Sequence, residues 1–396
     1  MNEWCWQHSA VYRERLQRAG FHGGDALSLD TLVKLPLLTR RDLQQQAQAL
    51  YCQPPASHLP VAETFTSGST GEPVTLHRSA VSQLFWQALT MREHQWWQRD
   101  LSGRLAAIKA SFNQPRVDTP SWGAPASLFA STGPAVALSM SMGSEALADA
   151  LIDIDPDYLL VFPSQLQAIQ QCYREQGRRP ARLKQIRCMS EVVTPELRAT
   201  VAEDFSLPLC DVYSSQEAGV IAIQCPHSGL YHIMAESLLV EVVNDQLQPC
   251  AEGEVGRVVI TDLHNFATPL VRYEIGDYAE VGPPCGCGRQ LPTLKRILGR
   301  QRNMAIYPDG HHYWPRLGFY RFRDIAPILQ FQVAQLSVDT LECRLYSERP
   351  LNSAEEGAIA EVIRSAMGYP FAIGFRYFDQ PIPASGGKYE EFVRLF

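Results

Sequence analysis

TSGSTGEP, which runs from Thr66 to Pro73, is the most informative stretch of this chain. Small hydroxyl residues and glycines fill most of it, namely Thr66, Ser67, Gly68, Ser69, Thr70 and Gly71. Such a run has little side chain to pack and many backbone N–H groups that can converge on an anion, which is typical of a flexible loop that wraps phosphates. No lysine follows the second glycine, so this is not a GxxxxGK[ST] P-loop. Because a polar surface turn has a similar composition, the rest of the chain must decide between the two interpretations.

Length, composition and charge indicate a globular protein. The 396 residues suffice for one large core and a small second domain. A content of 45% hydrophobic and 19% charged residues excludes a disordered chain. The formal net charge of −7 argues against a nucleic-acid partner, because nucleic-acid binding requires a basic face.

The sequence also predicts where the protein works. The N-terminal MNEWCWQHSA lacks the basic and apolar regions of a signal peptide, and no apolar run approaches the ~20 residues of a membrane span. We therefore expect a cytoplasmic protein without a membrane partner. Most of the ten cysteines, such as Cys188, Cys210 and Cys343, lie in apolar surroundings and are expected to be reduced core thiols.

Helices are predicted on both sides of the phosphate-loop candidate. The chain before it is expected to be mainly helical, with one helix capped at Thr39. After it, helical spacing predicts an amphipathic helix from Ser79 to about Trp97, with an apolar face made of Val81, Leu84, Phe85, Ala88 and Leu89. A loop that leads into a helix is a plausible anion site, because the first turn of the helix offers free N–H groups.

Strands and helices then alternate, which indicates a mostly parallel sheet with both faces covered. The predicted strands are Leu105–Ala110, Asp157–Phe162, Leu183–Met189 and Leu209–Tyr213. Helices are predicted from Glu145, around Leu166–Tyr173, and after Thr194, which is an N-cap followed by proline.

The second half of the chain is rich in strands. From Gly219 to about 300 the segments GVIAIQ, SLLVEVV, GRVVIT, LVRYE and YAEVG predict a β-rich subdomain. Strands near 331–336 and 341–346, a helix with Ser353 and Glu356 in capping-box spacing, and a strand IGFRYF predict a small α+β domain. We thus expect an α/β protein with a large domain, residues 1–300, whose sheets are mostly parallel, and a mobile lid domain, residues 301–396.

Four further stretches carry polar groups where ligands bind in α/β proteins. They are DVYSSQEAG (211–219), LVRYEIGDYAEV (270–281), GRQRNM (299–304) and GGKYEEF (386–392). Taken with the 66–73 loop and in this order, they resemble the adenylate-forming superfamily of acyl-CoA synthetases, peptide-synthetase adenylation domains and luciferases. TPLVRYEIGDYAEV followed by CGCGRQLPTLKRILGR is similar to the phenylacetate-CoA ligase branch.

The resemblance implies a role for each matching residue. The loop Thr66–Gly71 would hold the β- and γ-phosphates of ATP. Tyr213, followed by Ser214 and Ser215, would stack on adenine, and Glu217 would bind Mg²⁺ at the triphosphate. Asp277 would accept the ribose hydroxyls, with Arg300 beside them. Lys388 would bridge the attacking carboxylate and the α-phosphate as the transition state forms.

The implied reaction is formation of an acyl-adenylate from a small carboxylic acid and ATP, with release of pyrophosphate. The similarity to the phenylacetate-CoA ligase branch suggests that the acid is aromatic or aromatic-like. The acyl group would then pass to a thiol of CoA or of a carrier protein. Three departures from the family pattern stand in the sequence: Ser214 replaces a glycine, Arg302 replaces the usual hinge acid, and AIYPDGHHYWP (305–315) replaces the stretch found in CoA ligases. The last keeps open an amide synthetase with an amine acceptor, and a non-catalytic nucleotide-binding protein is an alternative of another class.

Two weaker sites complete the predictions. Thiolates and imidazole suit tetrahedral Zn²⁺, so Cys225, His232, Cys285 and Cys287 are candidate ligands of a structural zinc ion, with His227 as a less favoured histidine. Surface thiols beside a tight turn would show the same spacing. For the acyl pocket, Asn113, Trp122, Phe129 and Glu191 are candidates, although each of the aromatic and amide residues is equally consistent with loop packing.

Overall fold

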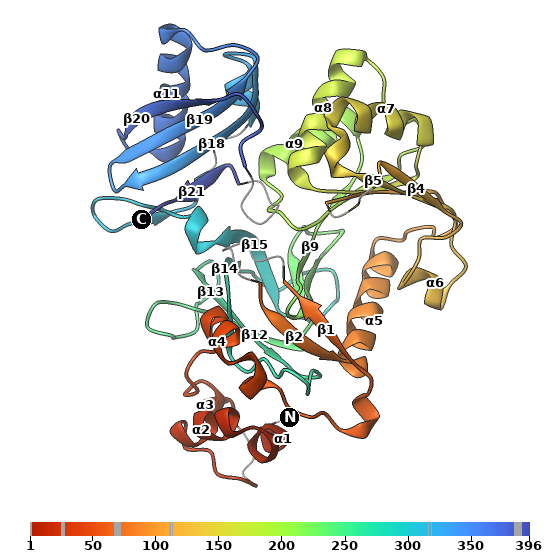
Figure 1. Cartoon of the computed structure of the whole chain (residues 1–396), viewed down its shortest axis with the longest axis vertical. Coiled ribbons are helices and arrows are strands. Elements are labelled where there is room, and N and C mark those ends of the chain that lie inside the picture. The colour runs from red at the N-terminus through yellow and green to blue at the C-terminus, as the bar shows by residue number, and fades with distance from the viewer. Residues whose placement is uncertain are drawn as a thin grey trace. The chain divides into compact units, whose positions relative to one another are not determined.

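The computed structural model describes residues 2–24, 28–66, 73–110, 112, 114–315, 317, 319–383 and 390–396 (Figure 1). The chain divides into two compact units, Met1–Ile297 and Leu298–Phe396. The sequence placed this division at 300/301. Within the described ranges, no helix combines the length and the apolar character needed to cross a bilayer.

The first unit begins with short helices, as predicted. They are α1 (Asn2–His8), α2 (Ala10–Arg18), α3 (Leu29–Leu32) and α4 (Arg40–Leu50). The predicted cap of α4 is confirmed, because Thr39 and Asp42 form a reciprocal capping box. The guanidinium of Arg272, which is fully buried, joins this region to the strands that follow: it donates to the carbonyl of Leu35 at 2.9 Å and pairs with Glu241 at 3.0 Å.

The prediction that the 66–73 stretch leads directly into a helix is wrong. The stretch connects two antiparallel strands, β1 (Val61–Phe65) and β2 (Thr75–Ser79), and helix α5 (Ala80–Trp96) follows only after β2. The alternating burial of β2 explains the strand, because its side chains face the core and the solvent in turn.

A sheet of six described strands in the order β4-β5-β3-β6-β7-β8 forms the α/β part of this unit. The pairings of its described strands are parallel except that of β4 with β5. The strands are β3 (Leu105–Lys109), β4 (Arg116–Thr119), β5 (Ala135–Ser139), β6 (Tyr158–Val161), β7 (Gln185–Cys188) and β8 (Leu209–Cys210). The helices are α6 (Ala126–Phe129), α7 (Ser144–Ile154), α8 (Pro163–Gln176) and α9 (Pro195–Phe205).

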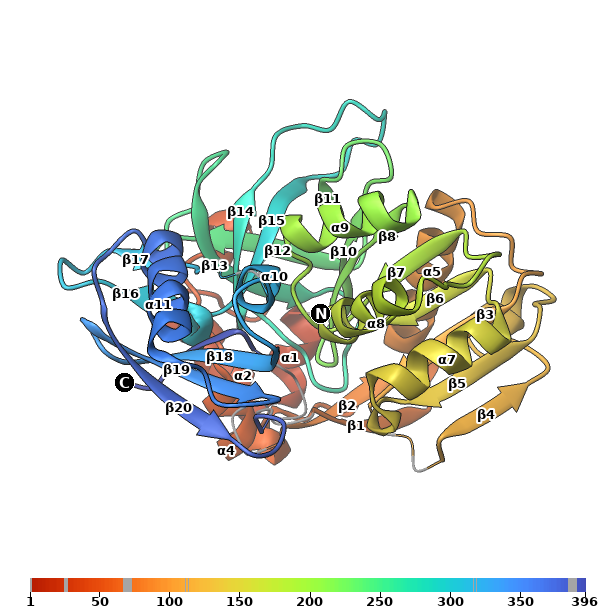
Figure 2. The same ribbon diagram turned by 90° about the horizontal axis from the view of Figure 1, so that it is seen from above.

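Helices cover both faces of this sheet (Figure 2). Helices α7, α8 and α9 share one apolar core with the strands, to which β7 contributes Ile186 and Cys188. Because side chains alternate along a strand, Gln185 and Arg187 point to the other face, and both bind residues at or just after the end of α5. The predicted covering of the sheet on two sides is therefore confirmed.

Helix α5 was predicted correctly, but its buried face was not. Leu84 is 53% exposed, whereas Leu89 and Glu93 are buried and Trp86 packs with Leu89 in a small core. The buried face of α5 is the one that carries Glu93, because this glutamate is fully buried and pairs with Arg99 at 2.5 Å and with Arg187 at 2.8 Å. A hydrophobicity pattern does not place a buried glutamate on the core side.

A second sheet, with described strands in the order β12-β13-β14-β15-β11-β10-β9, forms the β-rich subdomain. The pairings β9–β10, β10–β11, β11–β15, β12–β13 and β13–β14 are antiparallel, in contrast to the mostly parallel first sheet. The strands are β9 (Val212–Ser215), β10 (Gly219–Gln224), β11 (Tyr231–Ile233), β12 (Leu238–Val243), β13 (Val255–Asp262), β14 (Tyr273–Val281) and β15 (Thr293–Arg300).

The predicted single strand Leu209–Tyr213 is two strands. The chain leaves the parallel sheet at Cys210 and enters the antiparallel sheet at Val212, so Asp211 alone connects β8 to β9. An uninterrupted apolar run cannot reveal such a change of partner, because both strands are buried.

The second unit contains a mixed sheet in the order β20-β19-β18-β21, packed against α11 (Ser353–Met367). Its strands are β18 (Ile328–Ser337), β19 (Thr340–Ser347), β20 (Ala372–Phe378) and β21 (Phe392–Arg394). Before them come the hairpin β16 (Ala305–Ile306) and β17 (His312–Tyr313), and α10 (Phe319–Arg323). The capping box of α11 lies one residue earlier than predicted, at Asn352 and Glu355.

The buried charge cluster of α5 predicts a large effect of one substitution. Glu93→Gln should lower the free energy of unfolding at pH 7 by about 3–5 kcal/mol, because Arg99 and Arg187 lose their counter-charge in the interior. Urea denaturation followed by circular dichroism measures this loss. The matched control is Glu236→Gln. The carboxylate of Glu236 is 48% exposed and pairs with Arg92 of α5, so its loss should cost less than about 1 kcal/mol.

The pH dependence of this difference follows from the pKa of Glu93. Burial raises that pKa, but Arg187 and Arg99 lower it to about 2, below its ordinary value of 4.5. A depressed pKa stabilises the folded state above pH 4.5, and this contribution disappears as the pH falls toward 2. The difference between wild type and Glu93→Gln should therefore shrink below pH 4.5; an equal loss for both variants at pH 7 would contradict the assignment.

Candidate active site

Two of the predicted nucleotide-binding residues lie in direct contact. The hydroxyl of Tyr213, in β9, donates a hydrogen bond of 2.9 Å to Oδ2 of Asp277, in β14. These strands stand far apart in the order of the sheet, so the sheet must curl to bring the two side chains into contact. Tyr213 is buried in the core while Asp277 is half-buried, which leaves the carboxylate as the more accessible partner.

Asp211 determines where Tyr213 stands. It is buried, its Oδ2 accepts a 2.6 Å hydrogen bond from the hydroxyl of Tyr231, and its Oδ1 accepts one of 2.9 Å from the N–H of Val212. Burial raises the pKa of Asp211, and the hydrogen bond from Tyr231 and the charge of Arg198 only partly oppose this. The short link between the sheets is thus held by specific donors.

The turn after β9 carries the other predicted residues. Ser214 is exposed, and the hydroxyl of Ser215 accepts a hydrogen bond of 3.0 Å from the N–H of Ala218. Gly219 ends the turn with φ +77°, and a Cβ there would lie 3.2 Å from the ring of Trp86. Glycine is therefore required both by the backbone conformation and by the helix that packs beneath.

Two arginines hold this turn. Arg78, whose guanidinium stacks 4.2 Å from the ring centroid of Trp86, donates to the carbonyl of Gln216. Burial lowers the pKa of Arg78 to about 10, and the nearby carboxylates of Asp262 and Glu217 oppose that shift. Glu217 itself is buried and pairs with Arg40 at 3.2 Å. The second Nη atom of Arg40 donates to Oγ1 of Thr66 at 2.9 Å.

Thr66 is the one residue of the predicted phosphate loop that the structure describes; Ser67, Gly68, Ser69, Thr70 and Gly71 lie outside the described residues. Thr66 is buried, and both its N–H and its Oγ1 bond to Val74 at 3.0 Å. The two chain segments that flank the loop are thereby joined. Arg40 thus brings Thr66 and Glu217 together.

The remaining predicted residues of the reaction belong to the second unit. Arg300 is the last residue of β15, and Lys388 lies outside the described residues. Glu390, two residues after Lys388, accepts hydrogen bonds of 3.0 Å and 2.9 Å from Arg302. The arginine that replaces the usual hinge acid therefore anchors the chain just beyond the predicted catalytic lysine.

The structure gives the acyl-pocket candidates little support. The indole of Trp122 donates to the carbonyl of Gly103, which precedes β3 at the amino end of the parallel sheet, opposite to the end where such sheets bind ligands. Phe129 is 53% exposed. Glu191 accepts 2.9 Å and 3.1 Å bonds from Ser164 at the start of α8, so it caps a helix. Asn113 lies outside the described residues.

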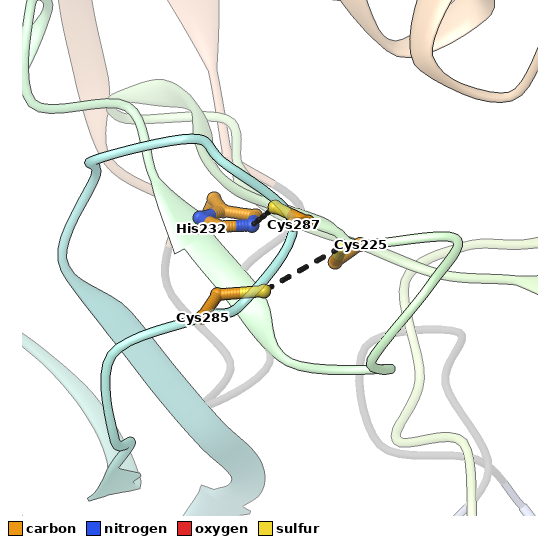
Figure 3. Close-up of side chains that lie close together, drawn as sticks. All are labelled: Cys225, His232, Cys285 and Cys287. Atoms are coloured by element: carbon orange, nitrogen blue, oxygen red, sulfur yellow. Dashed lines mark hydrogen bonds between the residues drawn. The ribbon is translucent and has the colours of Figure 1, made fainter.

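The predicted zinc ligands converge (Figure 3). Cys225 follows β10, His232 lies in β11, and Cys285 and Cys287 lie between β14 and β15. Their ligand atoms all lie within 4.8 Å of one another. Sγ of Cys285 is 3.8 Å from Sγ of Cys225, and Sγ of Cys287 is 3.3 Å from Nε2 of His232.

This donor set fits a tetrahedral zinc ion. With Zn–S bonds of about 2.3 Å, two sulfur ligands of a tetrahedron stand about 3.8 Å apart, which is the separation of Cys225 and Cys285. Burial raises the pKa of Cys287, but hydrogen bonds from Arg289 and the neighbouring thiols lower it to about 7, which favours the thiolate that binds metals. His232, and not His227, completes the set among the described residues.

Comparisons with known proteins agree with the motifs. No family model matches the chain. A phenylacetate-coenzyme A ligase from Pseudomonas putida is 25% identical over 319 residues, which are 76% of this chain and 70% of that protein. A 2-hydroxyisobutyryl-CoA ligase, solved with an acyl-adenylate in its postadenylation state, matches with a TM-score of 0.75 and 17% identity over 99% of this chain and 86% of its own.

The chain is similar to the adenylate-forming superfamily in its motifs and in its fold. It is a distant homologue of the phenylacetate-coenzyme A ligases over most of its length, as the motif order predicted. The same fold also serves an amide bond synthetase from Marinactinospora thermotolerans, which matches with a TM-score of 0.55 and 13% identity over 83% of this chain and 67% of its own. The fold alone therefore does not separate a thiol acceptor from an amine acceptor.

Sequence reasoning missed the two arginines of the site. Arg40 follows a predicted N-cap and Arg78 lies in a strand, where arginine is ordinary, so neither has a local signal. Their importance comes from contacts with residues that are distant in the sequence: Arg40 lies 177 positions from Glu217, and Arg78 lies 138 from Gln216.

The cysteine–histidine cluster predicts a structural metal. Purified protein should contain a single zinc ion per chain by elemental analysis, and strong chelators should lower its melting temperature, because the ion joins β10, β11 and the turn before β15. Cys285→Ser should lose the zinc, whereas Cys250→Ser, a half-buried cysteine outside the cluster, should keep it. A wild-type protein that neither contains zinc nor takes it up would disprove this site.

Proposed function

We propose that this protein is an ATP-dependent, AMP-forming carboxylic acid ligase. The observation that carries the proposal is the arrangement of the motif residues in the first unit: Tyr213 bonded to Asp277, and Glu217 next to Thr66 through Arg40. A carboxylate with a neighbouring aromatic ring suits a nucleoside, and a buried carboxylate beside the 66–73 loop suits the metal ion of a triphosphate. The distant homology to ligases that act on phenylacetate supports the same reaction class.

In this proposal Asp277 binds the ribose hydroxyls and Glu217 holds Mg²⁺, which supplies charge neutralisation at the phosphates. The carboxylate of the substrate attacks the α-phosphorus, a P–O bond forms, and the bond to the β-phosphate oxygen breaks with release of pyrophosphate. Lys388 stabilises the charge on the α-phosphate and the attacking carboxylate as that bond forms. The bond between Arg302 and Glu390 supports this role, because it anchors the chain two residues beyond the lysine.

The acyl group then passes from the adenylate to the sulfur of CoA or of a carrier protein, and AMP leaves. An aromatic or aromatic-like acid is proposed on the homology to phenylacetate-coenzyme A ligases. An amine acceptor is the second candidate, because the segment 305–315 differs from the CoA-ligase pattern and forms the short β16–β17 hairpin. A nucleotide-binding protein without turnover is the remaining alternative.

Pyrophosphate exchange tests the first half-reaction. Labelled pyrophosphate should enter ATP only when an acid of the right class is present, in a panel of aryl, arylacetic, fatty and amino acids. Lys388→Ala should reduce the exchange by about 100-fold, because it removes the cation at the transition state. The exposed Lys34→Ala, which removes the same charge elsewhere, should leave the exchange unchanged. Tight ATP binding without exchange for any acid would favour the non-catalytic alternative.

The acceptor is tested with the acid that supports exchange. Incubation with ATP and CoA should give the acyl thioester and AMP in equal amounts, measured by liquid chromatography with mass detection. The same reaction with a panel of amines and amino acids in place of CoA should give no amide. Amide without thioester would transfer the assignment to the amide synthetase, while the exchange result would stand.

A further inference from the structure

Arg40 joins two parts of the proposed ATP site that are distant in the sequence. One Nη atom lies 3.2 Å from Oε1 of Glu217, and the other donates to Oγ1 of Thr66 at 2.9 Å. Glu217 is the proposed Mg²⁺ ligand, and Thr66 is the first residue of the stretch predicted to wrap the phosphates. The guanidinium therefore stands between the group that would hold the cation and the segment that would hold the anion.

The position of Arg40 is determined by the strand that carries the proposed ribose ligand. It is the first residue of α4, directly after the capping residue Thr39. Leu38, two residues before it, pairs with β14: its N–H donates to the carbonyl of Arg272 at 2.8 Å, and its carbonyl accepts from Glu274 at 2.9 Å. Since β14 also carries Asp277, Arg40 and Asp277 are held by the same element.

An ion pair that only stabilises the fold explains this arrangement poorly. The side chain of Arg40 is 18% exposed and that of Glu217 is 6% exposed. Removing both charges from water costs about as much as their attraction returns, so the pair by itself adds little stability. The same chemistry suits a binding site, because a guanidinium keeps its charge at every relevant pH and matches phosphate oxygens with two parallel N–H groups.

We propose that Arg40 binds the β- and γ-phosphates of ATP and, without nucleotide, holds the carboxylate of Glu217 in place for the metal ion. When MgATP binds, Mg²⁺ replaces the guanidinium of Arg40 as the partner of Glu217. The guanidinium then turns its N–H groups from the carboxylate to the phosphates. The inference rests on the proposed function and adds a positioning and binding residue to it. It predicts selectivity for the triphosphate, because AMP has neither of the phosphates that Arg40 would contact.

Isothermal titration calorimetry with MgATP and with AMP tests this role in the full chain. Arg40→Ala should weaken the binding of MgATP by about tenfold or more, the loss expected for a charge-assisted hydrogen bond, and should change the binding of AMP by less than about twofold. Arg40→Lys keeps the charge but loses the paired N–H groups, so its affinity for MgATP should lie between those of Arg40→Ala and wild type.

Two further variants keep the test decisive. Arg41→Ala removes the same charge from the next residue of α4, which is exposed, and should bind both nucleotides as wild type does. Arg40→Gln retains a donor for Thr66 without the charge, and if Arg40→Ala does not fold, this variant should show the same selective loss of MgATP.

The contrary results are distinct. Unchanged MgATP affinity in Arg40→Gln and Arg40→Ala, or an equal loss for MgATP and AMP, would assign Arg40 to the fold and overturn this inference alone. Wild-type protein that binds neither nucleotide would overturn the proposed function and this inference with it.

Discussion

A single buried aspartate connects the two sheets of the large unit. Asp211 lies between β8, the last strand of the parallel sheet, and β9, the edge strand of the antiparallel sheet. A carboxylate in the interior is costly unless partners surround it; here Tyr231 and Val212 donate hydrogen bonds, and Arg198 supplies a counter-charge 3.9 Å away. These partners come from β9 and β11 of the antiparallel sheet and from α9. The change of sheet is therefore tied to one satisfied polar group, and Tyr213 follows it at a defined position.

The rest of the candidate site depends on this junction. The chain after β9 must turn back into β10, and the turn carries Glu217. Trp86 of α5 packs against Gly219, and Arg78 stacks on the same ring while it binds the carbonyl of Gln216. Helix α5 is in turn fixed to the parallel sheet by Glu93 and its two arginines. A few contacts of charged side chains thus connect the turn that carries Glu217 to both sheets.

The cysteine–histidine cluster also connects separate segments of the antiparallel sheet. It joins the end of β10, strand β11 and the turn before β15. Of those strands, β10 pairs with β9, and β9 carries Tyr213. A metal ion here would hold the turns of these strands together.

Local patterns in the sequence were enough to identify most of the elements and the similarity to the adenylate-forming superfamily. The caps at Thr39 and Thr194, the buried apolar strands and the order of the motifs depend on interactions within a few residues, or on residue types that chemistry requires, and a linear sequence displays both. The four candidate zinc ligands, which the structure brings together, were also identified by residue type, because few side chains bind zinc.

Only the tertiary structure decided which of these elements meet. The division of 209–213 between two sheets, the buried face of α5, and the contacts of Arg40 with Glu217 and Thr66 all join residues without a local relation. Apolar periodicity ranks faces by hydrophobicity, so it cannot place a buried ion pair such as that of Glu93. Long-range pairs of opposite charge are chosen by the packing of the whole chain, and that information exists only once the chain has folded.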